Sequence, residues 1–333
     1  MMQARLLTFI LAALWAALAL AAELTEEQIA ALAKRASEGQ RDSLTQLERL
    51  AGEGNAVAEL YMGHLYLSGR GVFRSEQKAI EWFRRAADRG HVPSAHNLGV
   101  IYERARGALQ DLGEALKWYR YAAERGYARS QANLGYMLAE GLGTSADLTQ
   151  AKGWMEKSAA QGEPRGRYLL GMLYLEGRGV DKNVAEAVRL VRLAAEGNLR
   201  DAQHRMALLY GNGTGVDKDD QQALEWLRKA ANQRHAEAQY LLSVIYAGGL
   251  YGVPHDDKLA LQWLRLSARQ DHAEAQYALG LAYAEGRGVP RDANEAYGWL
   301  LEAAKNGHQA AAEYVRRIQA GVSKPAAGEK PAK

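Results

Sequence analysis

The chain has 333 residues, of which 48% are hydrophobic and 24% charged, with 34 glycines, 6 prolines and no cysteine. This balance is that of a folded protein and excludes a disordered or collagen-like chain. A net charge of only +3 provides no basic field for a phosphate backbone, so no nucleic-acid partner is predicted. The absence of cysteine excludes disulfides, thiolate zinc sites, a cysteine nucleophile and a lipid-modified amino-terminal cysteine.

Residues 1–21 have the features of a secretory signal peptide. Arg5 is followed by an apolar run that ends at Leu20, and Ala19 and Ala21 form the small-x-small pattern that signal peptidase recognises. The apolar run has about 15 residues, fewer than the roughly 20 that span a bilayer. We therefore predict cleavage after Ala21 or Ala22, export to the bacterial periplasm and no integral membrane segment in the mature protein.

The next predicted elements are two helices within residues 22–55, which form an amino-terminal cap or a degenerate repeat. From Ala56 onward the sequence repeats seven times with a step of 36 residues, except for one step of 37. Each unit has a small residue at its eighth position. Six of the seven units have tyrosine three residues later, and six, not the same six, have tryptophan farther along. Such periodicity is the signature of a repeat protein. The predicted units are 56–91, 92–127, 128–163, 164–199, 200–235, 236–272 and 273–308.

Each unit is predicted to contain two helices that bury their apolar faces against neighbouring units. Glycine at the eighth position allows another helix to approach closely. Glycine-rich sequence such as Gly177 to Val180 ends the first helix, and acidic residues such as Asp181 and Asp292 favour the start of the second. After the repeats, residues 309–321 are predicted to form a capping helix and residues 322–333 a disordered tail.

The repeats contain four motifs in a constant order: Leu-Gly-x-x-Tyr, Gly-x-Gly-Val, Ala-x-x-Trp and Ala-Ala-x-x-Gly. In order and period these motifs resemble the Sel-1-like repeat family, which is related to tetratricopeptide repeats. The resemblance implies an all-α, right-handed superhelical solenoid of antiparallel helix pairs, which holds other proteins and has no catalytic residue. This chain departs from the pattern at Leu190, which replaces the tryptophan, and at Arg234 and Asp271, where a terminal glycine is usual.

The histidines are the residues that most suggest a metal site. However, His91, His235, His272 and His308 all occupy the last position of their units, which indicates a repeat motif, and no pair of histidines with metal-binding spacing is present. The glycine-rich segment 211–215 lacks the strand and the lysine of a phosphate-binding loop. We therefore predict no metal, no cofactor, no catalytic residue and no enzymatic activity.

A binding surface is predicted on the first helices of the units. If these helices line the concave side, as in tetratricopeptide repeats, then positions five and nine of each unit project into the groove, and position thirteen forms a charged rim. The candidate residues include tyrosine and methionine, which suit protein interfaces. The alternative for each side chain is that it packs against the next repeat. The candidates are Leu60, His64, His96, Tyr136, Tyr168, Met172, His204, Tyr240 and Tyr277, with Arg104, Glu140 and Glu176 at the rim.

These features predict a non-enzymatic periplasmic scaffold, monomeric alone, that captures a protein partner. Exported Sel-1-like proteins include immunity proteins that neutralise phospholipase toxins delivered by type VI secretion. That resemblance implies occlusion of a toxin's active-site cleft by the groove or by an end of the solenoid. The alternative partner is an envelope protein, which would make the chain a scaffold for envelope assembly or polysaccharide export. A hydrolase is a less favoured alternative, because Sel-1-like proteins described as lactamases use repeated cysteine pairs that this chain lacks.

Overall fold

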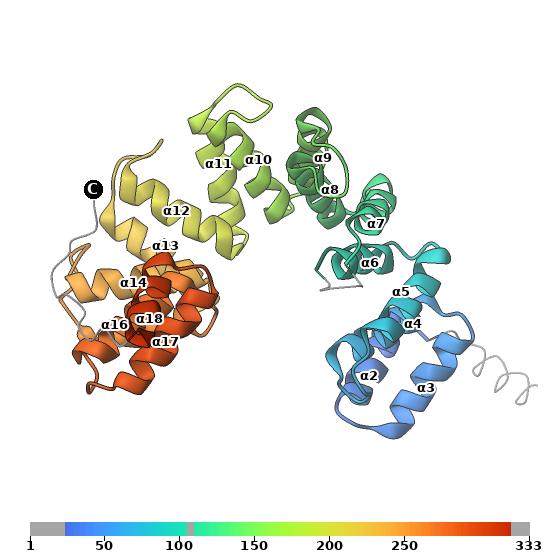
Figure 1. Cartoon of the computed structure of the whole chain (residues 1–333). Coiled ribbons are helices and arrows are strands. Elements are labelled where there is room, and N and C mark those ends of the chain that lie inside the picture. The colour runs from blue at the N-terminus through green and yellow to red at the C-terminus, as the bar shows by residue number, and fades with distance from the viewer. Residues whose placement is uncertain (1–23, 105–109, 321–333) are drawn as a thin grey trace, which may run out of the picture. The chain divides into compact units, whose positions relative to one another are not determined.

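The computed structural model describes residues 24–104 and 110–320. Within these ranges the chain forms 17 helices and no strand, which confirms the all-α fold class (Figure 1). The signal peptide predicted at residues 1–21 and the tail predicted at residues 322–333 lie outside the described residues. No helix in the described part of the chain is long and apolar enough to cross a membrane.

The chain divides into two compact units, Met1–Asp147 and Leu148–Lys333. Within each unit, a helix packs against the helices that precede and follow it, so that the two helices of a repeat pair with each other and with the next repeat. The first unit contains α2 (Glu26–Ser37), α3 (Arg41–Gly52), α4 (Ala56–Ser68), α5 (Glu76–Asp88), α6 (Val92–Arg104), α7 (Leu112–Glu124) and α8 (Ala128–Glu140). The second contains α9 (Leu148–Ala160), α10 (Pro164–Glu176), α11 (Val184–Glu196), α12 (Arg200–Asn212), α13 (Asp220–Asn232), α14 (Ala236–Gly248), α15 (Asp257–Ala268), α16 (Ala273–Glu285), α17 (Ala293–Lys305) and α18 (Gln309–Gln319).

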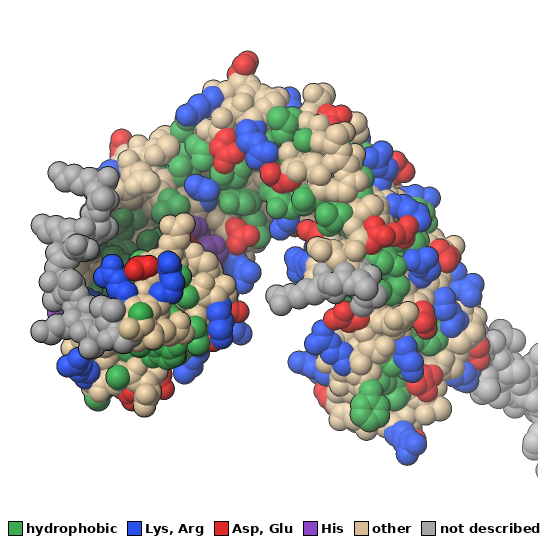
Figure 2. All heavy atoms as spheres, in the orientation of Figure 1, with side chains coloured by type: hydrophobic (Ala, Val, Ile, Leu, Met, Phe, Trp, Pro, Cys, Tyr) green, Lys and Arg blue, Asp and Glu red, His purple; other side chains and the backbone are tan. Residues whose placement is uncertain are grey.

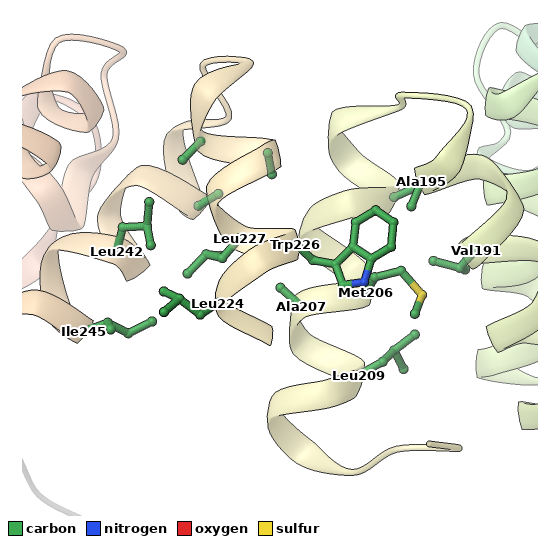
Figure 3. Packing of buried hydrophobic residues seen from close by; sticks show 14 of the residues in the cluster. Val191, Ala195, Met206, Ala207, Leu209, Leu224, Trp226, Leu227, Leu242 and Ile245 are labelled. Atoms are coloured by element: carbon green, nitrogen blue, oxygen red, sulfur yellow. The ribbon is translucent and has the colours of Figure 1, made fainter. Parts of the chain in front are cut away.

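The hydrophobic core lies between successive helices. In the second unit one cluster extends from Val188 on α11 to Ala260 on α15. Figure 3 shows Leu224 and Leu227 on the side of α13 that faces Leu242 and Ile245 of α14. Because each repeat contributes residues to the cluster of its neighbour, no repeat buries its apolar surface alone.

The eighth position is where the two helices of a repeat come closest. A β-carbon added at Gly99 would lie 2.6 Å from the ring of Tyr119, and one added at Gly63 would lie 2.5 Å from the ring of Phe83. Both rings are fully buried, so they have little room to move. The small residue predicted to allow close approach is therefore required by the aromatic ring opposite it.

Buried glutamines at the fourth position join consecutive repeats. Gln239 is 3% exposed; its Nε2 donates to the carbonyl oxygen of Ala231, in the last turn of α13, at 2.9 Å. Its Oε1 accepts from Gln270 Nε2 at 2.7 Å, so one side chain connects α13, α14 and the end of α15. Gln203 and Gln276 make equivalent pairs of bonds. Each of these carbonyl oxygens also accepts from the N–H of the following turn, so the glutamine supplies a second donor and links three helix ends through one buried amide.

The turns after the second helices keep one geometry whether or not they contain glycine. Arg234 and Asp271 both have a φ of 61°, in the left-handed region that favours glycine. Their backbone N–H groups donate to the carbonyl oxygens of Ala231 and Ala268 at 2.9 and 3.2 Å. The two departures from the family pattern therefore keep the left-handed residue and the hydrogen bond of the turn, at a φ lower than the 84° to 91° of the glycines in equivalent turns. The prediction that Asp181 begins a second helix is wrong, because Asn183 caps α11 and its side chain accepts from the N–H of the third helical residue.

We predict that Gly99→Ala lowers the free energy of unfolding by about 1–3 kcal/mol, because the added methyl group overlaps the buried ring of Tyr119. The matched control is Gly298→Ala on α17, where an added β-carbon would meet nothing within 4 Å. At that exposed helical site alanine should stabilise the protein by about 0.5–1 kcal/mol. Urea unfolding followed by circular dichroism measures both changes. Equal effects of the two substitutions would contradict the close-approach argument.

Candidate protein-binding surface

Three of the four fifth-position aromatic side chains of the second unit stack on the last residue of their own repeat, which directly precedes the next first helix. The fourth, Tyr168, is half-buried, and its repeat ends in Leu199. The rings of His204 and His235 have centroids 4.4 Å apart and an interplanar angle of 28°. Tyr240 stacks on His272 at 5.2 Å, and Tyr277 stacks on His308 at 4.1 Å. These three fifth-position residues therefore make contacts between repeats, which is the alternative to a role in partner binding.

The last-position histidines cap helices. Nδ1 of His272 accepts from the backbone N–H of Ala275 at 3.2 Å, and His235 and His308 make the same bond to the third residue of the helix that follows each. A ring nitrogen can accept only when it carries no proton, so these caps require neutral imidazoles. Nε2 of His272 lies 2.6 Å from Oε2 of Glu237, and this hydrogen bond lowers the pKa of Glu237.

The pKa values of the stacked histidines His204 and His235 are both lowered. Burial, with a smaller contribution from the ring of His235, lowers the pKa of His204 to about 4. Burial also lowers the pKa of His235, against the opposing charge of Asp201. Nε2 of His204 is buried and has no hydrogen-bond partner. A proton added to this pair would therefore be poorly solvated.

The predicted residues of the first unit lie on three of its first helices. His96 on α6 is half-buried, with Nδ1 2.9 Å from Oγ of Ser130 and its ring 5.1 Å from Tyr127. His64 on α4 is exposed and lines a hollow beside α2. The remaining members are the half-buried Leu60 and Tyr136 and the exposed Arg104 and Glu140.

In the second unit the ninth position presents an apolar row that the stacking contacts described above do not use. Val244 is 41% exposed, and the other members are partly exposed. We call these residues the ninth-position row: Met172, Leu208, Val244 and Leu281. The sequence predicts that the ninth position projects into the groove, but only Met172 of these four residues is among the candidates named from it.

Charged side chains flank this row at the ends of α10 and α16. The exposed Glu176 lies 3.8 Å from Arg178, and Glu285 lies 2.6 Å from Arg287. Figure 2 shows acidic and basic side chains interspersed on the visible face of each unit. Among the described residues no group of three or more metal-binding side chains comes together. The arrangement can therefore offer a partner an apolar row with a mixed-charge border.

We predict that the unfolding free energy decreases as the pH falls from 6.5 toward about 4, because unfolded His204 takes up a proton in this range and folded His204 does not. One such group contributes a slope of at most about 1.4 kcal/mol per pH unit. His204→Tyr introduces the residue found at the fifth position of the next two repeats and removes this titration. Urea unfolding at a series of pH values should give a shallower dependence for the variant. An unchanged slope would contradict the assignment.

Comparison with known proteins supports the repeat assignment. The family model described as Sel1 repeat matches residues 56–91, 92–127, 128–163, 164–199, 200–235, 236–272 and 273–308. No curated protein sequence matches the chain.

Similar solved structures include Sel1 repeat proteins. One, from Oxalobacter formigenes, is 32% identical with a TM-score of 0.62, over 88% of this chain and 86% of that protein. The protective antigen c5321 of uropathogenic Escherichia coli, which displays an SLR fold, is 30% identical with a TM-score of 0.59, over 83% of this chain and 59% of the antigen. The immunity protein Pa5087 from Pseudomonas aeruginosa is 20% identical with a TM-score of 0.45, over 58% of this chain and 73% of that protein. With seven matched repeats, the chain belongs to the Sel1 repeat family.

Proposed function

We propose that this chain is a non-enzymatic scaffold of the periplasm that captures a protein partner on the first helices of its repeats. The observation that carries the proposal is the ninth-position row. At the fourth, fifth and eighth positions of the second unit, several side chains are committed to contacts within or between repeats. The ninth position instead keeps aliphatic side chains in partial contact with solvent over four consecutive repeats. Apolar side chains aligned in this way suit burial against another protein.

The most concrete form of the proposal is an immunity protein that neutralises a type VI secreted toxin of the phospholipase class. Support comes from the secretory leader predicted at residues 1–21 and the seven Sel1 repeats. This is an argument from family resemblance and not from a catalytic or ligand site. The mechanism needs no chemistry, since apolar contact over the toxin's cleft would exclude its substrate.

We expect Val244→Glu to weaken partner capture by at least about tenfold, because a carboxylate buried without a partner opposes association. The matched control is Leu266→Glu on α15, which is a second helix. Leu266 is 43% exposed, close to the 41% of Val244. Quantitative mass spectrometry of proteins retained from an envelope extract by each immobilised protein measures the difference. A partner lost equally from both variants, or from neither, would contradict the proposed surface.

The same measurement separates the functional alternatives. A secreted phospholipase among the specifically retained proteins supports the immunity role, and export or outer-membrane machinery supports an assembly scaffold. Replacement of Tyr168, Tyr240 and Tyr277 is a poorer test, because Tyr240 and Tyr277 stack on capping histidines and their loss would also lower stability. Hydrolysis of lipid or lactam by the purified protein would contradict a non-enzymatic role.

Export is tested by fractionation of cells that produce the full chain. We expect the protein in the periplasmic fraction, with an amino terminus at Ala22 or Glu23 after removal of the signal peptide. Intact mass spectrometry of the purified protein gives the cleavage site directly. Recovery of the uncleaved chain from the cytoplasm would contradict the proposed location.

A further inference from the structure

The first unit contains a hollow between α2 and α4 that differs from the ninth-position row in its chemistry. Its volume is about 510 Å³, and alanines and leucines of the two helices line it together with Tyr61 and His64. Two cations, Lys34 and Arg70, also line it, and no carboxylate does. We call this site the amino-terminal hollow.

Neither cation of the hollow has an ion-pair partner among the described residues. A comparison with other repeats shows why Arg70 lacks one. Arg178 and Arg287 occupy the position equivalent to Arg70, and each lies near a glutamate two residues earlier, at 3.8 and 2.6 Å. In the first repeat the residue two positions earlier is Ser68, whose hydroxyl donates to its own helix backbone. The first repeat thus keeps the arginine and lacks its counter-ion.

The buried carboxylate of α4 is already paired with other cations. Glu59, which is fully buried, is engaged by Arg85 and Arg89 at 3.0 and 3.5 Å. Lys34 lies in the last turn of α2, where the helix dipole offsets only part of one charge. The lining of the hollow therefore carries two cations and no carboxylate over an apolar floor.

The polar groups on the helix walls of the hollow are oriented. Nε2 of His64 lies 3.3 Å from Nδ2 of Asn97, which can donate to it when Nε2 carries no proton. The edge contact of His64 with Phe83, with centroids 5.2 Å apart, holds the ring in place. The wall thus places an imidazole ring on the same hollow as the two cations.

The loop that contains Arg70 is held against α2 and carries an exposed aromatic side chain. A β-carbon at Gly71 would lie 2.2 Å from the carbonyl oxygen of Ala36, so the loop backbone touches the end of α2. Phe73, three residues after Arg70, is 97% exposed. The equivalent residues of the fourth and fifth repeats are Asp181 and Asp217, so the repeat does not require an aromatic residue there. An exposed phenylalanine on an anchored loop suits contact with an apolar partner side chain.

We infer that the amino-terminal hollow binds a segment of a protein partner that presents a carboxylate next to an apolar side chain. The carboxylate binds between Lys34 and Arg70, and the apolar side chain contacts the floor of the hollow or Phe73. This inference rests on the proposed scaffold function and specifies the chemistry of one part of the captured surface. Charge complementarity selects an acidic segment, because two unpaired cations favour a carboxylate and repel a basic segment.

The test uses random linear peptides displayed on phage and selected against the immobilised mature protein. We expect enrichment of peptides in which aspartate or glutamate adjoins an apolar residue. A synthetic peptide from this set should bind at least about tenfold more weakly to Lys34→Gln/Arg70→Gln, as expected for loss of charge-assisted hydrogen bonds. Arg41→Gln on α3, an exposed cation outside the hollow, is the matched control and should leave affinity unchanged. Phe73→Ser should weaken binding without altering thermal unfolding.

Failure of the selection to enrich acidic peptides, or equal affinity for the double variant and the control, would overturn the inference. Because all three replaced cations are exposed, circular dichroism should show an intact fold in each variant. The outcome is separable from that of the proposed function. If Val244→Glu abolishes partner capture while Lys34→Gln/Arg70→Gln does not, the result supports the scaffold function and contradicts the inferred role of the hollow.

Discussion

In three of the repeats of the second unit, stacking depends on a buried glutamine at the fourth position of the first helix: Gln203, Gln239 and Gln276. Each such side chain donates to the end of the preceding second helix and accepts from the end of its own. A two-helix repeat must bring helix ends into its core, and the polar backbone groups there would be costly without partners. In the first repeat Glu59 and Arg89 occupy the equivalent positions, so an ion pair replaces the pair of amides.

This constraint separates two kinds of residue on a first helix: those that contact other helices and those that are exposed to solvent and available to a partner. The fourth, fifth and eighth positions include side chains that face other helices, and the last residue of a repeat caps the next one. Side chains with these duties cannot be exchanged freely without loss of stability. The ninth position and the loop between helices are less constrained, and there the chain carries Val244 and Phe73 with large exposed apolar surface. A scaffold can therefore change its partner without changing its fold.

The fold could be predicted from the sequence because the repeat copies the same physical requirement seven times. The small residues at the eighth position predicted a close approach of helices. The structure places aromatic rings opposite two of them, Gly63 and Gly99. The roles of Tyr240 and Tyr277 could not be assigned in the same way, because an aromatic residue suits both an interface and a stack on histidine. The hollow was not predicted, since it depends on the packing of α2, which has no repeat pattern, against α4. The missing counter-ion of Arg70 was visible in sequence only once the pairs at Arg178 and Arg287 showed what to expect.

The central claim is that the first helices form the surface that captures a partner. Hydrogen–deuterium exchange of the mature protein, with and without the partner that it retains, tests this claim most directly. The account predicts that the partner slows exchange in the first helices of the second unit, α10, α12, α14 and α16, and leaves the second helices α11, α13, α15 and α17 unchanged. Protection confined to the second helices would contradict it.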